Sequence, residues 1–268
     1  MDRLKKTFDR LAEKGEKALV GFVSAGDPDM ETSLEIIRNM CEAGLDILEL
    51  GVPFSDPTAD GPVIQRSSAR ALEKGITLET VLEMTRRIRE YSDIPIILFS
   101  YYNPVFAFGA RQFYTFALEK GADGVLIVDL PPEESDEMTG VWEGNELSLI
   151  RLIAPTTPVE RMKTISDSAS GFLYMVSKTG VTGSDGLDTS AIESYVKTLR
   201  SVTHLPICVG FGISTPEDVR AISKMADGIV IGSAFERLIE NHLEDDDLPE
   251  LLGKQTRLFK NATRKGYV

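Results

Sequence analysis

The sequence has few of the residues that build metal centres, disulfide frameworks or reactive thiol pairs. It contains two cysteines, Cys41 and Cys208, and two histidines, His204 and His242. None of these four residues lies in a spacing typical of a zinc site, and the two cysteines are far apart in the chain. We therefore expect two separate buried thiols, no disulfide and no metal site.

Basic residues are in the minority, with 29 Lys and Arg against 42 Asp and Glu and a formal net charge of −13. A surface of this sign disfavours nucleic acids and anionic membranes, because basic patches bind their phosphates. A small phosphorylated molecule needs only a local site and is not excluded. No run of apolar residues reaches the length of a membrane span, and residues 1–8 lack the apolar core of a signal peptide. We expect a cytoplasmic protein that binds neither nucleic acid nor membranes.

Short apolar segments alternate with segments of helical spacing along the 268 residues. The predicted strands are 18–24, 45–50, 94–99, 124–128, 147–153, 171–177, 205–210 and 227–232. The predicted helices that follow them are 34–44, 63–72, 78–91, 111–120, 133–141, 159–166, 192–199, 216–225 and 234–239. Alternation of this kind predicts a parallel sheet with its helices outside.

Eight strands without a linker favour a closed barrel over the rival fold, an open doubly wound sheet. The predicted fold class is therefore α/β, a single (β/α)8 TIM barrel spanning residues 1–268 as one domain. An extra N-terminal helix around residues 4–11 is expected to cover the bottom of the barrel. A C-terminal helix over 248–259 is expected to pack on the outside, after an acidic loop at 244–247.

The stretch 48–62 passes from a buried strand into a loop that contains two prolines, and it carries two candidate catalytic carboxylates. Strand alternation places Glu49 on the same face as Leu45 and Ile47. A carboxylate on a buried face must find partners or have a raised pKa, which indicates acid/base chemistry, with a structural carboxylate as the alternative. Asp60 is the second candidate, although a turn residue or a cap for the next helix is equally compatible.

Two further polar residues, Asp129 and Tyr174, map to the same functional face at the carboxyl ends of the strands. Asp129 is equally compatible with an organiser of its own loop. Tyr174, taken alone, is more typical of a core residue than of a catalytic one.

Glycines cluster at 179–183, 210–214 and 232–233, in the loops after the sixth, seventh and eighth predicted strands. Glycine lets backbone N–H groups approach an anion, and the last loops of such barrels commonly hold a phosphate. Tight turns between strand and helix are the structural alternative. The 210–214 cluster lacks the third glycine of a dinucleotide-binding motif. Together these residues indicate an enzyme that acts on a small phosphorylated molecule, without identifying the substrate.

The segment 48–65 closely resembles the signature of the tryptophan synthase alpha subunit family. Further matching segments, in the same order and spacing, are 24–28, 102–104, 129–131, 154–158, 180–183, 210–213 and 232–233. The resemblance implies a TIM barrel lyase that cleaves indole-3-glycerol phosphate to indole and glyceraldehyde 3-phosphate, with no cofactor of its own. It also implies a beta-subunit partner in an α2β2 assembly. That partner holds PLP and uses the indole to make L-tryptophan.

The resemblance assigns roles to individual residues of this sequence. It implies that Glu49 is the general acid/base, that Asp60 holds the indole N–H as the second catalytic carboxylate, and that Tyr174 lies beside Glu49. The positions implied to bind the rest of the substrate are Phe22, Phe99, Tyr101, Val128, Ile153 and Thr182. The positions implied to bind its phosphate are Gly183, Gly210, Phe211, Gly212, Gly232 and Ser233. The positions implied to meet the beta subunit are Pro53, Phe54, Asp56, Asn103 and Pro104.

Two loops, 53–60 and 178–188, resemble the mobile elements of the family, whose closure would exclude water. Lys178 stands where several members carry Arg, and lysine cannot form the same bidentate fork. Ser24 stands where Thr is common.

Two other functions are alternatives to the lyase. Another phosphate-binding barrel of the same pathway would be expected to place a catalytic Lys or Cys near the barrel mouth. No Lys lies at the carboxyl end of a predicted strand in this sequence. A non-catalytic allosteric barrel would not need both carboxylates.

Overall fold

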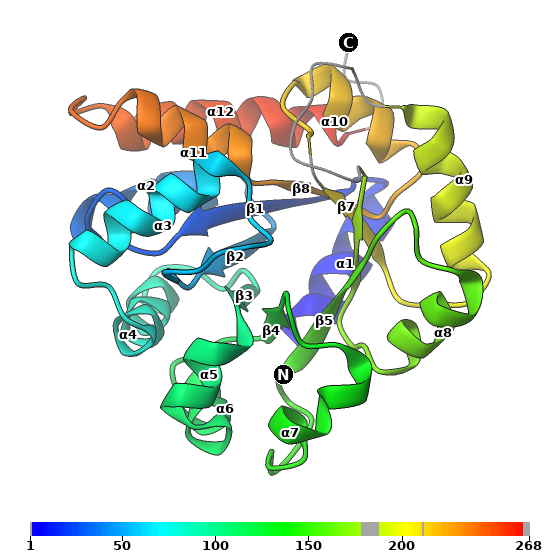
Figure 1. Ribbon diagram of the computed structural model, residues 1–268. Helices are drawn as coiled ribbons and strands as arrows, with labels where there is room; N and C mark the ends of the chain where they lie inside the picture. The colour runs from blue at the N-terminus through cyan, green and yellow to red at the C-terminus, as the bar shows by residue number, and fades with distance from the viewer. Residues whose placement is uncertain (1, 178–187, 211, 265–268) are drawn as a thin grey trace.

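A computed structural model describes residues 2–177, 188–210 and 212–264, and its eight parallel strands close into a barrel in chain order (Figure 1). The strands are β1 Ala18–Ser24, β2 Ile47–Gly51, β3 Ile96–Ser100, β4 Gly124–Ile127, β5 Ser148–Ile153, β6 Leu173–Val176, β7 Ile207–Gly210 and β8 Gly228–Ile231. Closure is direct, because β1 pairs with β2 and also with β8. The predicted barrel is confirmed, and the open sheet that was its rival is excluded.

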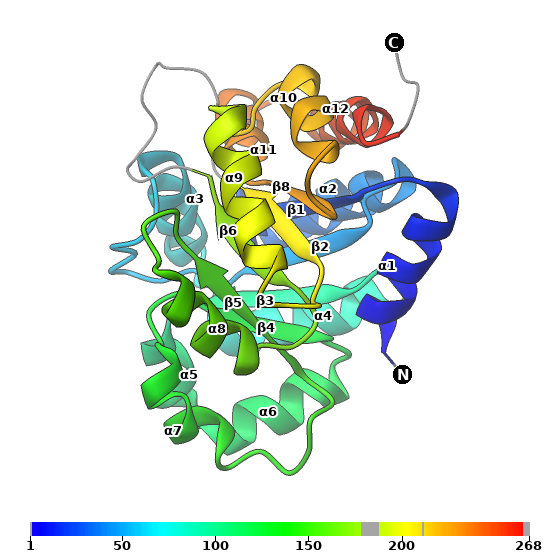
Figure 2. The ribbon, with the colours of Figure 1, turned by 90° about the vertical axis from the view of Figure 1, so that its right-hand side faces the viewer.

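Helices surround the barrel and cover its outer face (Figures 1 and 2). They are α1 Arg3–Lys14, α2 Met30–Glu42, α3 Pro62–Glu73, α4 Leu78–Arg89, α5 Tyr102–Phe108, α6 Ala110–Glu119, α7 Asp136–Thr139, α8 Val159–Asp167, α9 Thr189–Arg200, α10 Pro216–Ser223, α11 Ser233–Asn241 and α12 Leu248–Ala262. A 3-10 turn, η1 Pro132–Glu134, precedes α7. None of the described helices is both long and apolar enough to cross a membrane.

The N-terminal helix α1 closes the bottom of the barrel, as predicted. Its Leu4 and Leu11 join a cluster of buried side chains that fills the barrel interior, including Ile47 of β2. The ring of Phe8 lies 6.0 Å from that of Phe172, centre to centre. A second and larger apolar cluster fills the layer between the strands and the outer helices. The bottom of the barrel is thus sealed by side chains, which leaves the top for a ligand.

The C-terminal helix α12 packs on the outside of the barrel, as predicted, and a buried ion pair fastens it. Lys260 Nζ lies 2.7 Å from the carboxylate of Asp46, and both side chains are about 95 % buried, with 5 % and 4 % of their surface exposed. Asp46 comes directly before β2, so the ion pair joins the last helix to the base of the strand that carries Glu49. The acidic loop 244–247 is exposed before α12, as expected.

Three expectations about local structure were wrong. Leu45 does not share a face with Glu49, because β2 begins only at Ile47 and Leu45 packs in the outer cluster. The expected helix over 133–141 is a 3-10 turn over Pro132–Glu134 followed by the four-residue α7, which ends before Gly140. Helix α5 was not predicted. Of the two free thiols, Cys208 is buried as expected but Cys41 is only half-buried.

Candidate active site

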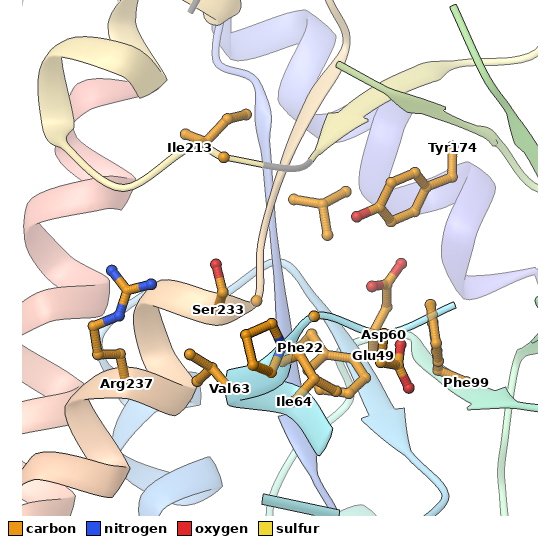
Figure 3. Close-up of a pocket in the computed structure, with 15 residues that line it drawn as sticks. Phe22, Glu49, Asp60, Val63, Ile64, Phe99, Tyr174, Ile213, Ser233 and Arg237 are labelled. Carbon is orange, nitrogen blue, oxygen red and sulfur yellow. The ribbon is translucent and has the colours of Figure 1, made fainter. Parts of the chain in front are cut away.

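A cavity lies at the carboxyl ends of the strands (Figure 3). The residues predicted from the sequence that line it are Phe22, Glu49, Asp60, Phe99, Tyr174, Gly212, Gly232 and Ser233. These residues come from six strands, or the loops after them, far apart in the chain. The fold therefore gathers both candidate carboxylates and part of the glycine clusters around one space.

Glu49 lies in the middle of β2 and points into the barrel mouth. Its neighbours across the sheet are Phe22 of β1 and Ile97 of β3. The side chain is 1 % exposed, and Oε1 is buried without a hydrogen-bond partner among the described residues. Burial raises the pKa of Glu49 to about 8. The carboxyl group is therefore mostly protonated at neutral pH, and it is free to exchange a proton with a ligand.

Asp60 ends the loop after β2 and faces the same cavity (Figure 3). Its side chain does not cap α3, because the N-cap residue is Gly61 and no side chain bonds there. Burial raises the pKa of Asp60 to about 6, while a hydrogen bond with the Tyr101 hydroxyl opposes that rise. The same hydroxyl accepts the Ala59 N–H at 3.0 Å and so holds the end of the loop in place. The capping alternative for Asp60 is thus not supported.

The two carboxyl groups have different environments, and this separates their roles. At pH 7 Glu49, with a pKa of about 8, carries a proton, while Asp60, with a pKa of about 6, is ionised. Divergent pKa values of neighbouring carboxyl groups are the arrangement that lets one act as an acid and the other as an anion. Tyr174 is buried beside them, and both burial and the Glu49 charge raise the pKa of its hydroxyl. Tyr174 therefore stays neutral, and its hydroxyl can donate or accept a hydrogen bond.

Apolar side chains form the walls of the cavity beside the carboxyl groups. The rings of Phe22 and Phe99 meet edge to face, with centroids 5.2 Å apart. Val63 and Ile64, from the first turn of α3, line the cavity as well. A flat apolar group can lie against these walls, and burial of its surface would supply binding energy.

The opposite end of the cavity is built for an anion. Gly212 has a φ of +74°, a backbone conformation that residues with a side chain rarely adopt. This glycine lines the cavity in the loop after β7. Helix α11 begins at Ser233 after Gly232, and no side chain caps its first turn. Helix N-termini carry partial positive charge and free N–H groups, so this end favours a phosphate.

The remaining predicted residues have different locations. Tyr101 lines a small adjoining cavity together with Pro53 and Phe54. Val128 and Ile153 line neither of these two cavities. Lys178, Thr182, Gly183 and Phe211 lie outside the described residues. Asp129 accepts the Tyr102 N–H at 2.8 Å, which supports its reading as a loop organiser at the start of α5.

The predicted partner-contacting residues lie on two adjacent segments at the top of the barrel. Pro53, Phe54 and Asp56 belong to the loop after β2, and Asn103 and Pro104 lie in α5. The segments touch where the ring of Phe54 packs at 5.2 Å from that of Tyr101, the residue before α5. Asp56 and Asn103 are exposed, so polar groups of both segments are available to another molecule.

Sequence reasoning missed several residues of the cavity. They are Gly61, Pro62, Val63, Ile64, Ile213, Val230 and Arg237. A signal for Arg237 was present, because it follows Ser233 by four residues and therefore shares its face of the helix. In the described part of the chain, no group of three His, Cys, Asp or Glu side chains is placed to hold a metal ion.

Gly210, at the end of β7, leaves the room that the Tyr174 ring occupies. A Cβ atom at this position would meet the Tyr174 hydroxyl oxygen and lie 2.7 Å from Cζ, and Tyr174 is 6 % exposed with little space to move. We expect Gly210→Ala to displace the ring toward Glu49 and to lower kcat by about tenfold or more, with a loss of about 1–3 kcal/mol in unfolding free energy. Steady-state kinetics and chemical denaturation measure the two effects. Unchanged kcat and stability would show that the ring has another place to go.

Comparisons with known proteins agree with one another. The family model described as tryptophan synthase alpha chain matches residues 8–263. The chain is 62 % identical over 264 residues to the tryptophan synthase alpha chain of Desulfosudis oleivorans, covering 98 % of this chain and 100 % of the relative. It is 59 % identical over 264 residues to that of Desulfatibacillum aliphaticivorans, with the same coverage. Among solved structures, tryptophan synthase subunit alpha from Legionella pneumophila superposes with a TM-score of 0.90 at 37 % identity, covering 98 % of each chain.

Proposed function

This chain belongs to the tryptophan synthase alpha chain family, and from that premise we propose how its cavity performs the reaction. The chain is a lyase of tryptophan biosynthesis that cleaves indole-3-glycerol phosphate to indole and glyceraldehyde 3-phosphate. The substrate has a flat apolar end and a phosphate end. The cavity has two ends of the same kind, which orient the substrate in one direction.

The indole lies against Phe22 and Phe99, with its N–H toward Asp60 and its C3 atom toward Glu49. The phosphate lies at the other end, against Gly212, Gly232 and Ser233. Further contacts to the substrate are assigned to Tyr101, Val128, Ile153 and Thr182. Further contacts to the phosphate are assigned to Gly183, Gly210 and Phe211.

The reaction is a retro-aldol cleavage in which one carboxyl group handles both protons. The protonated carboxyl of Glu49 gives its proton to C3 of the indole, and the positive charge that develops on the ring nitrogen is stabilised by the Asp60 carboxylate. The Glu49 carboxylate then accepts the proton of the hydroxyl on the carbon attached to C3. The carbon–carbon bond breaks as that hydroxyl becomes the aldehyde, and its electrons return to the ring to give indole. The enzyme ends the cycle with Glu49 protonated again.

The observation that carries this assignment is the pair of pKa values at one cavity. Glu49 at about 8 is an acid at neutral pH, and Asp60 at about 6 is an anion. A general acid works best when its pKa is near the operating pH, because the protonated form is then abundant and still acidic enough to transfer its proton. Tyr174 is assigned as the residue that lies beside Glu49 and shields it from water.

We further propose that the chain works with a beta subunit as an α2β2 assembly in the cytoplasm, and that residues 1–268 form one domain. The contacts are assigned to Pro53, Phe54, Asp56, Asn103 and Pro104. The PLP of the partner would perform the second reaction, while this chain uses only its own acid and base side chains. Two of the similar solved structures are of tryptophan synthase from Mycobacterium tuberculosis, at 30 % and 28 % identity with TM-scores of 0.90 and 0.88.

Adding the beta subunit is expected to stimulate indole-3-glycerol phosphate cleavage. The partner would contact the loop that ends at Asp60 and would favour the closed arrangement of the cavity. The measurement is a titration of the isolated chain with a beta subunit, with indole and glyceraldehyde 3-phosphate production recorded at each ratio. An absence of indole in every mixture would overturn the proposed activity. Indole formation that is unchanged at saturating partner would overturn the complex alone.

A further inference from the structure

One side chain at the phosphate end of the cavity, Arg237, takes no part in the proposed mechanism. Arg237 of α11 lines the cavity, and it is the only basic residue among the described residues that do so. The other charged groups of this lining are the carboxyl groups of Glu49 and Asp60. Without Arg237, the only charge of this lining would be negative. It would repel a substrate phosphate, which carries close to two negative charges.

Arg237 is placed on the same side of α11 as the predicted phosphate contact Ser233. The two residues are four positions apart on one helix, so they are neighbours on its surface. In Figure 3 the Arg237 guanidinium and the Ser233 hydroxyl both point toward the loop that carries Ile213. Both side chains therefore border the space that the helix N-terminus faces.

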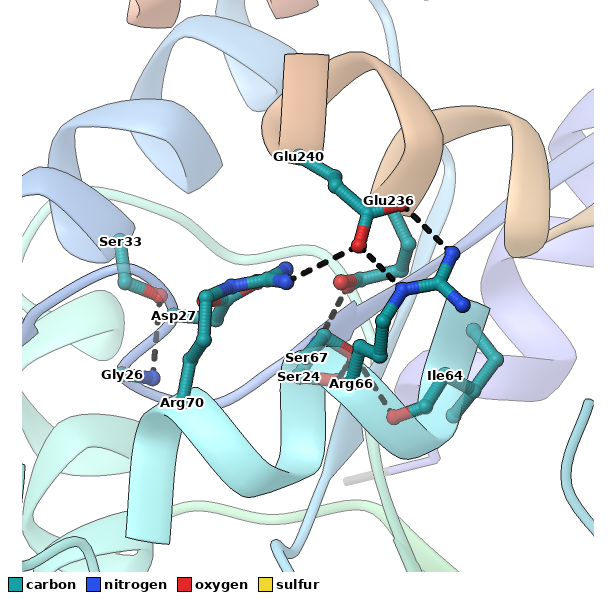
Figure 4. Close-up of polar contacts among 10 residues, drawn as sticks. All are labelled: Ser24, Gly26, Asp27, Ser33, Ile64, Arg66, Ser67, Arg70, Glu236 and Glu240. Atoms are coloured by element: carbon teal, nitrogen blue, oxygen red, sulfur yellow. Dashed lines mark hydrogen bonds and ion pairs between the residues drawn. The ribbon is translucent and has the colours of Figure 1, made fainter. Parts of the chain in front are cut away.

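Two other arginines lie nearby on α3, and both are already neutralised (Figure 4). Arg66 binds the Glu240 carboxylate in a bidentate manner, with Nη2 at 2.8 Å. Arg70 binds Asp27 through two nitrogens, at 2.8 and 2.7 Å, and also contacts Glu240. Arg237 forms no hydrogen bond or ion pair with the rest of the described chain. Of these three arginines, Arg237 is thus the one whose charge remains available to a ligand.

Helix α11 is held rigidly enough to place this charge. Glu236, the residue before Arg237, is fully buried, and its carboxyl oxygen accepts the Ser24 N–H at 2.7 Å from the end of β1. One turn later, Glu240 makes the ion pairs with α3 shown in Figure 4. Two successive turns of α11 are therefore fixed to β1 and α3, and Arg237 extends from a fixed backbone.

We propose that Arg237 binds the substrate phosphate, completing the anion site formed by the N-terminus of α11. This rests on the proposed assignment of the phosphate to that end of the cavity. The helix N-terminus supplies about half of a positive charge, whereas the guanidinium supplies a full charge and two parallel N–H donors that match phosphate oxygens. Arg237 is thus a binding and positioning residue, and the proton transfers stay with Glu49.

The test compares Arg237→Ala and Arg237→Lys with the unmodified chain in the synthetic direction, in which indole and glyceraldehyde 3-phosphate condense. We expect Arg237→Ala to raise KM for glyceraldehyde 3-phosphate by about tenfold, as befits loss of a charged hydrogen bond, and to leave KM for indole unchanged. Arg237→Lys should recover part of the loss. Inorganic phosphate, used as a competitive inhibitor, should bind more weakly to Arg237→Ala by a similar factor.

The matched control is Arg86→Ala on α4, which removes the same charge from a surface arginine paired with Glu83 and Glu90. It should leave both KM values unchanged. The proposal is overturned if Arg237→Ala leaves KM for glyceraldehyde 3-phosphate and phosphate inhibition unaltered, or if KM for indole rises by the same factor. Failure of the unmodified chain to make or cleave indole-3-glycerol phosphate would instead overturn the proposed function, so the two failures are distinguishable.

Discussion

Glu49→Gln is expected to lower the rate of indole release from indole-3-glycerol phosphate by about 10²–10⁴-fold. Glutamine has the shape of the protonated carboxyl group but cannot give a proton to the indole ring or accept one from the hydroxyl. The substrate should still bind, because the aromatic walls and the phosphate end are untouched. The measurement is single-turnover cleavage at saturating substrate, with circular dichroism as the check on folding. Turnover close to that of the unmodified chain would remove Glu49 from the mechanism.

The same substitution has a second expected result, in stability. Glu49 ionises with a pKa of about 8 when folded and near its ordinary value of 4.5 when unfolded, so the folded chain holds a proton that the unfolded chain releases between these values. Stability contributed by this proton is fully present below about pH 4.5 and is lost as the pH rises toward 8, by up to about 1.4 kcal/mol per pH unit. Glu49→Gln should remove this loss and be more stable than the unmodified chain at pH 8.

Chemical denaturation at pH 5.5 and pH 8 separates this effect from others. Glu236 is also fully buried, with a pKa raised to about 8 mainly by burial and by Asp27, so it should impose a similar decline on both proteins. The difference between the two declines therefore reports Glu49 alone. Equal declines would mean that Glu49 is ionised in the folded chain, contrary to its assignment as an acid.

The sequence predicted the barrel because its pattern is local. Each strand is a short apolar run, and each is followed by a helix of regular spacing, so the order of elements could be read without tertiary contacts. Glu49 was conspicuous for the same reason, as a charged residue inside an apolar run. The prediction that Leu45 shares a face with Glu49 was wrong, because β2 begins only at Ile47 and side chains alternate between faces only within the strand.

The rest of the site depends on contacts between distant elements. Arg237 looks like any exposed helical arginine until α11 is seen to begin at the cavity. That Arg66 and Arg70 are neutralised while Arg237 is not depends on Glu240 and Asp27, which no local pattern pairs with them. The pKa of Asp60 depends on how the loop after β2 folds back over the cavity and on the Tyr101 hydroxyl. Such features follow from closure of the barrel and not from spacing along the chain.

Asp60→Asn is expected to lower kcat by about 10²–10³-fold while binding of phosphate esters survives. The amide can still meet the indole N–H through its oxygen, but it carries no charge to stabilise the positive ring that forms when C3 is protonated. The loss should therefore fall on the transition state and not on the bound substrate. The measurements are kcat for indole-3-glycerol phosphate cleavage and the inhibition constant of inorganic phosphate, with Asp93→Asn in the exposed turn before β3 as the matched control.

Turnover and phosphate binding that fall by the same factor would show that Asp60 serves only to hold its loop. The structure argues against that result, because the backbone of the loop is held by other groups. The Asp60 N–H donates to the Pro57 carbonyl at 3.0 Å, and Tyr101 holds the neighbouring Ala59 N–H. The side chain is not needed to cap α3, which starts from Gly61 without it. Asparagine should therefore preserve the loop as well as Asp60 does. The substitution should instead lower kcat, because no negative charge then stabilises the positive charge that develops on the substrate.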